Sequence, residues 1–444
     1  QEASDGVLLG ESVFKSGGLS ALNCGMMGAI RLDRLASAYL DKHIYINTIQ
    51  PFCLVCVGVQ GMGKSHSMNV VLENCMMSCP QPTANPIIRL QREMCALVLH
   101  YDQSVNNVCE TTGLSTLCRT LRPSPAVPSD HSLSGCKRLV ILVSPSYYKQ
   151  RKEFYGNQFE VKPLLFKWLL TAPQLKKLMR LSDKDAQLYV SVMLNRLRSF
   201  QREGKVPVFE EFLKQVKTEC NLKGQEGPLG QRLDLLESVV NDLMADQADL
   251  SELMCSGTLV VADLTDPMLP ADEANGIFQV LLEQFRNKHL PGVGKVVAFD
   301  EAHKYLTPSS GGGTGGKDEL SYAITNTVRM MRHEGIRILI STQSPLALPQ
   351  ELLELVSMTV IHHFQSQDWY EYLKSKIPIP VNGFDIIKKL TVGEALISCS
   401  RMEGNFRTFS PGCEQDMMNE IVTWLEVKMR KRITADYGSS KLNL

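Results

Sequence analysis

A glycine-rich segment that ends in Lys64 and Ser65 carries the residue types needed to bind phosphate groups. Residues 58–65 read G-V-Q-G-M-G-K-S and fit the spacing GxxxxGK[ST]. The glycines let backbone N–H groups surround phosphate oxygens, and a following helix adds a favourable dipole. In this motif the lysine reaches the β- and γ-phosphates and the hydroxyl ligates Mg²⁺. The alternative is an ordinary glycine turn. We predict a nucleotide site formed by Gly58, Gly61, Met62, Gly63, Lys64, Ser65 and His66.

Two adjacent carboxylates follow a second apolar segment. Residues 296–303 read V-V-A-F-D-E-A-H, so a buried strand ends in Asp300 and Glu301. Paired with a phosphate-binding loop, this order is typical of a Walker B motif, in which the first carboxylate holds Mg²⁺. The second carboxylate orients or activates the attacking water. A solvated strand end is the alternative. We therefore expect Ser65 and Asp300 at the metal and Glu301 as the catalytic base.

The next strand along the chain ends in a polar residue, Gln343, within the run I-L-I-S-T-Q-S-P. In a nucleotide-dependent motor this position can sense the γ-phosphate, although a simple polar strand end has the same appearance. Upstream lie Arg329, Arg332 and Arg337. An arginine near the phosphates can stabilise transition-state charge, either within one subunit or across a subunit interface. A surface arginine on a helix is the ordinary alternative for each of them.

Alternating strands and helices are predicted around these motifs. Strands are expected at residues 52–57, 96–101, 138–144, 258–264, 295–299, 336–341, 358–364 and 394–400. Helices are expected at residues 64–78, 272–287 and 320–332. This alternation indicates an α/β fold with a mostly parallel central sheet covered by helices. The motifs then lie at strand ends, where such sheets bind their ligands.

The remaining segments suggest a domain plan. Helical periodicity over residues 161–255, with twelve Lys/Arg against six Asp/Glu in 161–220, predicts a helical insertion whose basic faces are either solvated or a binding surface. Residues 103–137 and the run SSGGGTGG at 309–316 are read as loops, and a helix is expected from 414 to about 432. The plan comprises an N-terminal segment 1–48, a core 49–160 with the phosphate loop, the insertion 161–255, a second part of the core 256–412 and a C-terminal helix and tail 413–444.

Composition excludes several classes of protein. The formal net charge is 0, with 44% hydrophobic and 21% charged residues, so the chain is neither disordered nor strongly basic. No apolar run is long enough to span a bilayer. The first residues, Q-E-A-S-D, lack the basic and apolar regions of a secretory signal. They also lack an initiator methionine, which suggests a fragment or a processed chain. The thirteen cysteines lie mostly beside apolar residues, which indicates a reducing, intracellular compartment, cytoplasmic or nuclear. Cys53 and Cys56 are expected on opposite strand faces.

The order of motifs resembles the HerA branch of the HerA/FtsK superfamily of RecA-like ATPases. The loop at 58–65 is followed by the strand at 258–264, the pair Asp300-Glu301, the R-x-x-R-x-x-G-I run at 329–336, the STQSP run at 341–345 and the strand at 394–400. The resemblance covers roughly residues 40–410. It implies a homo-hexameric ring that uses ATP and Mg²⁺ to translocate double-stranded DNA, often beside a nuclease partner. It also implies that Gln343 is the sensor and that Arg329 or Arg332 lies close to the γ-phosphate.

Two other functions remain open from the residues alone. The tetrad D-E-A-H at 300–303 also spells the box of DEAH helicases, but 236 residues separate it from Lys64, and too little chain follows residue 345 for a second RecA domain. The other alternative is a nucleotide-switched interaction or signalling ATPase, in which the helical insertion and the basic tail bind protein partners.

Overall fold

The structure is a computed structural model, and most of the chain is described in it. The described residues are 4–15, 23–31, 41–77, 87–116, 135–168, 170–180, 188–203, 208–219, 226–240, 250–306, 319–406 and 423–436. The loop predicted at 309–316 and residues 117–134 of the one predicted at 103–137 lie outside these ranges. Among the described helices, none is both long and apolar enough to cross a membrane.

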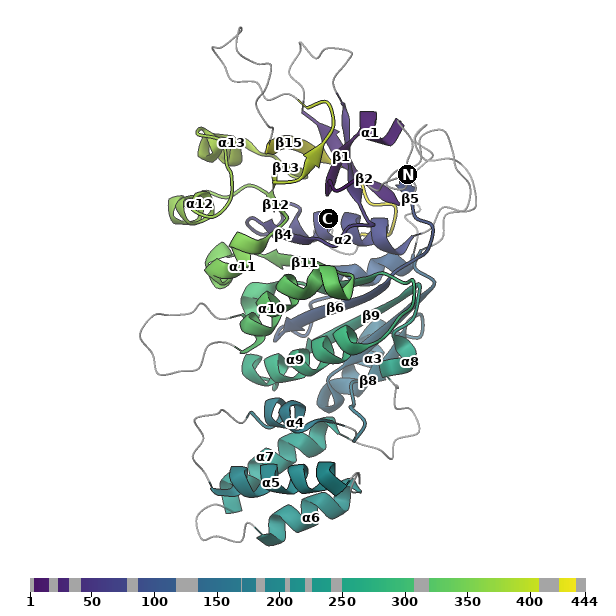
Figure 1. The fold of residues 1–444 in the computed structure, drawn as a ribbon, viewed down its shortest axis with the longest axis vertical. Coiled ribbons are helices and arrows are strands. Elements are labelled where there is room, and N and C mark those ends of the chain that lie inside the picture. The colour runs from purple at the N-terminus through teal and green to yellow at the C-terminus, as the bar shows by residue number, and fades with distance from the viewer. Residues whose placement is uncertain are drawn as a thin grey trace.

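Fifteen strands of the described chain form one sheet, which runs through the middle of Figure 1. Eight neighbouring strands in this sheet are parallel. Their residues are almost all buried, as expected for a parallel sheet covered on both faces. In spatial order they are β12 (Met358–Ile361), β4 (Cys53–Val57), β11 (Ile336–Thr342), β10 (Lys295–Phe299), β6 (Cys95–Asp102), β9 (Thr258–Thr265), β7 (Arg138–Val143) and β8 (Glu160–Pro163).

A mainly antiparallel flank extends the sheet beyond β12. It joins the two ends of the described chain, because β1 pairs with β14 and β15 pairs with β2. No element was predicted with certainty in the first fifty residues, yet three strands form there. The flank consists of β13 (Glu394–Cys399), β15 (Trp424–Met429), β2 (Cys24–Ile30), β3 (His43–Asn47), β1 (Leu8–Gly10), β14 (Met402–Glu403) and β5 (Ile88–Arg89).

The helix predicted from 414 to about 432 is wrong where the structure describes it. Residues 424–429 form strand β15, which pairs antiparallel with β13 and β2. The run W-L-E-V-K-M buries Leu425, Val427 and Met429 and leaves Lys428 exposed, which is the period of two expected of a strand. Residues 407–422 lie outside the described ranges.

The helical stretch predicted from residue 161 begins later than expected. Residues 160–163 form β8, and Leu164, Leu165 and Trp168 are buried in chain without helical structure. Helices follow as expected, and four of them gather at one end of the molecule, beyond β8 (Figure 1). They are α4 (Ala172–Leu178), α5 (Leu188–Glu203), α6 (Phe209–Glu219) and α7 (Glu226–Val239). The short helix α8 (Leu250–Leu253) is drawn nearer the sheet.

Two hydrophobic cores lie on opposite faces of the sheet. Within β4, Cys53 and Val55 belong to one core and Leu54 and Cys56 to the other, as the alternation of a strand requires. One core contains α2 (Lys64–Met76) and α3 (Tyr148–Tyr155). The other contains α9 (Ala271–Asn287), α10 (Glu319–Glu334), α11 (Gln350–Leu355), α12 (Gln367–Lys374) and α13 (Gly383–Lys389). The short helix α1 (Glu11–Lys15) precedes β2.

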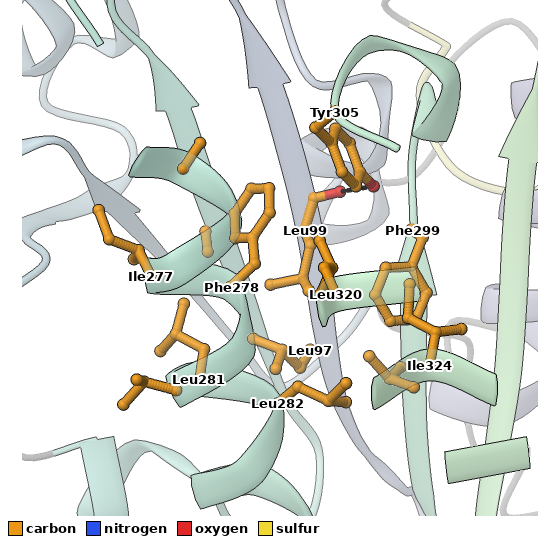
Figure 2. Close-up of a cluster of buried hydrophobic side chains, with 14 of the residues drawn as sticks. Leu97, Leu99, Ile277, Phe278, Leu281, Leu282, Phe299, Tyr305, Leu320 and Ile324 are labelled. Atoms are coloured by element: carbon orange, nitrogen blue, oxygen red, sulfur yellow. Dashed lines mark hydrogen bonds between the residues drawn. The ribbon is translucent and has the colours of Figure 1, made fainter. Parts of the chain in front are cut away.

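The packing of α9 and α10 fixes the strand that carries the carboxylates. Figure 2 shows Phe278 and Leu281 of α9 and Ile324 of α10 beside Leu97 and Phe299 on strands β6 and β10. These side chains are fully buried. The predicted strands between residues 52 and 400 all appear, with ends within one residue except for β12, which stops three residues early. Because β4, β10, β11 and β6 are parallel, the segments that follow them meet at one edge of the sheet.

Candidate functional site

The segment between β4 and α2 has a backbone that requires glycine. Gly63, the residue before α2, has φ 109°, a conformation that residues with a Cβ rarely adopt. A Cβ on Gly58 would lie 2.7 Å from the Cβ of His362, so only glycine fits there. Residue 59 is tied to the next strand, because the Val59 N–H donates to the His363 carbonyl at 3.1 Å. The chain therefore forms a tight loop at the N-terminus of α2.

His362 packs against this loop at Gly58. Burial lowers the pKa of His362 to about 4, so its imidazole is neutral at neutral pH. Its Nδ1 lies 2.9 Å from the Glu394 carbonyl oxygen and its Nε2 lies 3.0 Å from the Ser67 hydroxyl. A carbonyl only accepts, so Nδ1–H donates to Glu394 and Nε2 accepts from Ser67. This single tautomer links the first turn of α2 to strand β13.

Lys64 begins α2 and folds back over the loop. Its Nζ donates to the Val59 carbonyl at 3.1 Å, and the residue is only 4% exposed. Burial lowers the pKa of Lys64, while the carboxylates of Glu301 and Asp300 oppose that shift. A buried ammonium beside two carboxylates and a helix N-terminus is suited to hold a polyanion.

Asp300 lies directly after β10 and contacts His100 on the neighbouring strand. The parallel register that pairs Leu99 with Phe299 brings the two following residues side by side. His100 Nδ1 lies 3.1 Å from Asp300 Oδ2, and both side chains are buried. The hydrogen bond and charge of Asp300 raise the pKa of His100, although burial, the largest single effect, lowers it. Asp300 Oδ1 has no hydrogen-bond partner among the described residues, which leaves it available as a ligand.

Glu301 is held by Gln343 and His303. It has φ 49°, one of two non-glycine residues in the described chain with positive φ, and such backbone strain clusters at functional sites. Gln343 Nε2 donates to Glu301 Oε2 at 2.8 Å. His303 Nδ1 accepts from the Gln343 N–H at 3.3 Å, which leaves its Nε2–H, 3.4 Å from Glu301 Oε2, as a donor. The strand end predicted as a sensor therefore contacts the predicted base directly.

A cleft of about 560 Å³ brings these segments together. Of the residues predicted for nucleotide, metal and catalysis, eight line it: Gly61, Gly63, Lys64, Ser65, His66, Asp300, Glu301 and Gln343. Gly58 and Met62 belong to the same loop but do not line the cleft. The cleft thus combines a phosphate-binding loop with two carboxylates and an amide.

Three polar residues beside Asp300 were missed by the sequence analysis: His100, Cys109 and Glu110. Ligand atoms of His100, Cys109 and Asp300 lie within 4.8 Å of one another. Burial raises the pKa of the Cys109 thiol well above its usual value, so it stays protonated and is a poor metal ligand. Burial, with the nearby Asp300 carboxylate, raises the pKa of Glu110 to about 7. No motif marks Cys109 and Glu110, because the short 3₁₀ helix η2 (Glu110–Ser115) lies in a segment read as a loop. His100 lies on the predicted strand at 96–101, but no pattern links it to Asp300.

The three arginines lie away from this cleft. Arg329 and Arg332 are exposed near the C-terminal end of α10, and Arg329 forms an ion pair with Glu351. Arg337 is buried, and its guanidinium donates to the carbonyls of Thr48, Ile49 and Gly335. Arg337 therefore holds the segment before β4, and none of the three lines the cleft.

The residues present fit a nucleoside triphosphate with a divalent cation. The loop can present backbone N–H groups and Lys64 to phosphates. Ser65 and Asp300 both line the cleft, and the Ser65 hydroxyl and the unpartnered Asp300 Oδ1 are oxygen ligands of the kind that Mg²⁺ prefers. Glu301 faces the same space with its carboxylate fixed by Gln343. Such an arrangement can position a water molecule for attack on a terminal phosphate.

Comparison with known proteins identifies the fold. No family model matches the sequence, and no curated protein matches it. Among solved structures, VirB4 of Thermoanaerobacter pseudethanolicus matches with a TM-score of 0.51 at 13% identity, covering 92% of this chain and 96% of VirB4. The packaging NTPase B204 of Sulfolobus turreted icosahedral virus 2, solved with AMPPCP, matches with a TM-score of 0.31 at 11% identity, covering 79% and 92%. EssC from Geobacillus thermodenitrificans matches with 0.35 at 9% identity, covering 93% and 45%.

The likeness to VirB4 defines the class of protein by its fold. The chain shares the fold of VirB4 over almost its whole length. The predicted fold class, an α/β RecA-like fold with a mostly parallel central sheet covered by helices, is therefore confirmed.

Proposed function

We propose that this chain is an ATP-hydrolysing motor of the HerA/FtsK/VirB4 type. One observation carries the proposal: Gln343 donates to Glu301 at the end of the cleft that the phosphate-binding loop forms. If residues 58–65 were an ordinary glycine turn and Glu301 a solvated strand end, neither the Gln343–Glu301 hydrogen bond nor the shared cleft would be expected. The solved VirB4 fold and the nucleotide-bound B204 structures are in keeping with it.

Each residue has a task in this proposal. The loop and Lys64 bind the phosphates, and Ser65 and Asp300 hold Mg²⁺, which supplies charge neutralisation on the phosphate oxygens. Glu301 orients the attacking water and accepts its proton. Gln343 fixes the Glu301 carboxylate, and because it follows β11 it can transmit the state of the terminal phosphate to that strand.

The direct test is nucleotide binding and turnover by the purified chain. Wild-type protein should bind ATP and release phosphate in the presence of Mg²⁺. Lys64→Ala removes the cation that meets the phosphates, so both binding and turnover should be lost. A wild-type protein that binds no nucleotide under any Mg²⁺ concentration contradicts the proposal.

The finer proposal is a homo-hexameric ring that moves double-stranded DNA, with a possible nuclease partner. It rests on the motif order, and the helices over residues 172–253 are proposed as an insertion in the ATPase core. The test is ATPase activity with and without duplex DNA at low salt, because phosphate contacts weaken steeply as salt is added. Stimulation by DNA favours the motor, and no stimulation over a range of lengths favours the nucleotide-switched interaction protein.

The DEAH-type alternative has little support from the topology. A helicase of that class supplies arginines from a second RecA domain, but all the described strands after residue 345 belong to the same sheet as β4.

A further inference from the structure

The basic run K-M-R-K-R at 428–432 lies beside the nucleotide cleft. It comprises the end of β15 and the first residues of a segment described to residue 436. Lys428, Lys431 and Asp436 all line the cleft, as do Val392 and Gly393 from the turn before β13. We call residues 428–436 the C-terminal strap. No residue of this strap belongs to the proposed catalytic residues or to the sequence motifs described above.

Buried charges anchor the strap to α2, the helix that begins with Lys64. Arg430 Nη1 donates to Glu73 Oε2 at 2.6 Å, and Arg430 Nη2 donates to Asn74 Oδ1 at 2.9 Å. Glu73 Oε1 accepts from the N–H groups of Ile433 and Thr434 and from the Thr434 hydroxyl, at 2.7 to 2.9 Å. Because Glu73 is fully buried, these bonds are shielded from water and fix the strap against the helix.

A second set of bonds ties the strap to the phosphate-binding loop itself. The Gly393 N–H donates to the Met62 carbonyl at 3.3 Å, and the Met429 N–H donates to the Gly393 carbonyl at 2.9 Å. Lys428 Nζ donates to the Val392 carbonyl at 2.8 Å. The turn 392–393 therefore lies between the loop and β15 and is bonded to both. The wall of the cleft on this side is continuous.

The order of strands places the strap opposite the reacting groups. The carboxylates of Asp300 and Glu301 follow β10, which is two strands from β4 in one direction. β15 is three strands from β4 in the other direction. The phosphate-binding loop follows β4, so a nucleotide whose terminal phosphate faces Glu301 must extend its nucleoside half toward the strap. His66, in the first turn of α2, lies on the side of the cleft that faces the strap, because its Nε2 is 2.8 Å from the Arg430 carbonyl oxygen.

Lys431 is the strap residue that is available for a ligand. Its side chain is exposed and forms no hydrogen bond or ion pair with any residue that the structure describes, whereas Arg430 and Lys428 have the partners given above. We propose that the strap is the nucleoside-side wall of the site and that Lys431 binds the α-phosphate, the phosphate group attached to the nucleoside. This inference rests on the proposed function and adds the part of the ligand that ATP and ADP share.

The test compares ATP and ADP binding to wild type and to Lys431→Gln, with a fluorescent nucleotide displaced by each. The dissociation constants for ATP and ADP should rise by the same factor, about fivefold for one lost charged contact at a partly exposed site. Raising the ionic strength should shrink the difference, because screening weakens the contact in the wild type. Lys388→Gln is the matched control, since Lys388 is also exposed but does not line the cleft.

Thermal unfolding of Lys431→Gln should match wild type, which separates binding from folding. Equal affinities of Lys431→Gln and wild type for both nucleotides would overturn the strap proposal alone. Weakening confined to ATP would overturn it too, because it would place Lys431 at the γ-phosphate. A wild type that binds neither nucleotide would instead overturn the proposed function on which the strap proposal depends.

Discussion

At the scale of the residue, the site is built from neighbours that only the folded sheet brings together. The spacing of Gly58, Gly63 and Lys64 and the adjacency of Asp300 and Glu301 are visible in the sequence, because each motif is contiguous. His100 lies 200 residues before its partner Asp300. The pairing depends on the register of β6 with β10, which no local pattern encodes.

The contact of His100 with Asp300 predicts a role in holding the metal ligand. Replacing a residue that orients a metal ligand typically costs 10–100-fold in metal affinity. We expect His100→Ala to raise the Mg²⁺ concentration for half-maximal ATP turnover about tenfold. His100→Asn should restore most of the affinity, because its amide can donate from nearly the position of Nδ1. Mn²⁺ binding followed by electron paramagnetic resonance supplies a readout apart from turnover, and identical metal affinities in all three proteins would contradict the role.

Burial of His362 predicts a pH-dependent stability. Its folded pKa of about 4 lies below the usual 6.5, so below pH 6.5 the unfolded chain takes up a proton that the folded chain does not. Stability should fall as pH drops from about 6.5 to about 4, by at most about 3 kcal/mol from this group. In His362→Gln this contribution to the pH dependence of the unfolding free energy should vanish, which urea unfolding at several pH values would measure. The exposed His333→Gln is the control, and equal slopes in both variants would contradict the argument.

At the scale of the element, contiguous apolar strands were predictable, whereas the strands of the flank other than β13 were not. Apart from β5 and β8, the strands from β4 to β13 appear where sequence patterns placed them, because their residues are buried on both faces. β15 was mistaken for a helix end because its short run is flanked by basic residues, which also suit a helix C-terminus. Its identity depends on pairing with β2, about 400 residues earlier in the chain.

The anchoring of the strap predicts a large loss of stability when Arg430 is removed. Glu73 is fully buried, so Arg430→Met leaves its charge without the guanidinium and should cost about 3 kcal/mol in urea unfolding. The double variant Arg430→Met/Glu73→Gln should recover part of this loss because the buried charge is gone. Arg31→Met is the control, since Arg31 is exposed and its pairs should contribute less than about 1 kcal/mol. Equal losses for Arg430→Met and Arg31→Met would contradict the anchoring.

At the scale of the whole molecule, one sheet contains the strands of the RecA-like core and the strands near both ends of the described chain. The covered, mostly parallel sheet could be predicted from alternating strands and helices. Its RecA-like class was implied by the resemblance of the motif order to the HerA/FtsK superfamily. Strands β1, β2 and β3 could not, because these short segments pair with one another and, through β1 and β2, with β14 and β15 from the other end of the described chain. The positions of the arginines could not be predicted from the motif either, because Arg329 and Arg332 belong to it but lie on the surface.

The exposed positions of Arg329 and Arg332 predict action between subunits. Neither lines the cleft of its own chain, so any contact with a phosphate requires a second copy. We expect mixtures of wild-type and Arg332→Ala subunits to lose ATP turnover non-linearly with the fraction of variant, and likewise for Arg329→Ala if it is the residue in contact. A strictly linear loss for both variants would argue against a shared site.

The measurement that tests the central claim most directly is ATP binding and turnover by Glu301→Gln, taken together. If Glu301 activates the attacking water, the variant should bind ATP within about twofold of wild type and hydrolyse it at least about 100-fold more slowly, the scale of a lost general base. Turnover by Glu301→Gln at the wild-type rate would contradict the account.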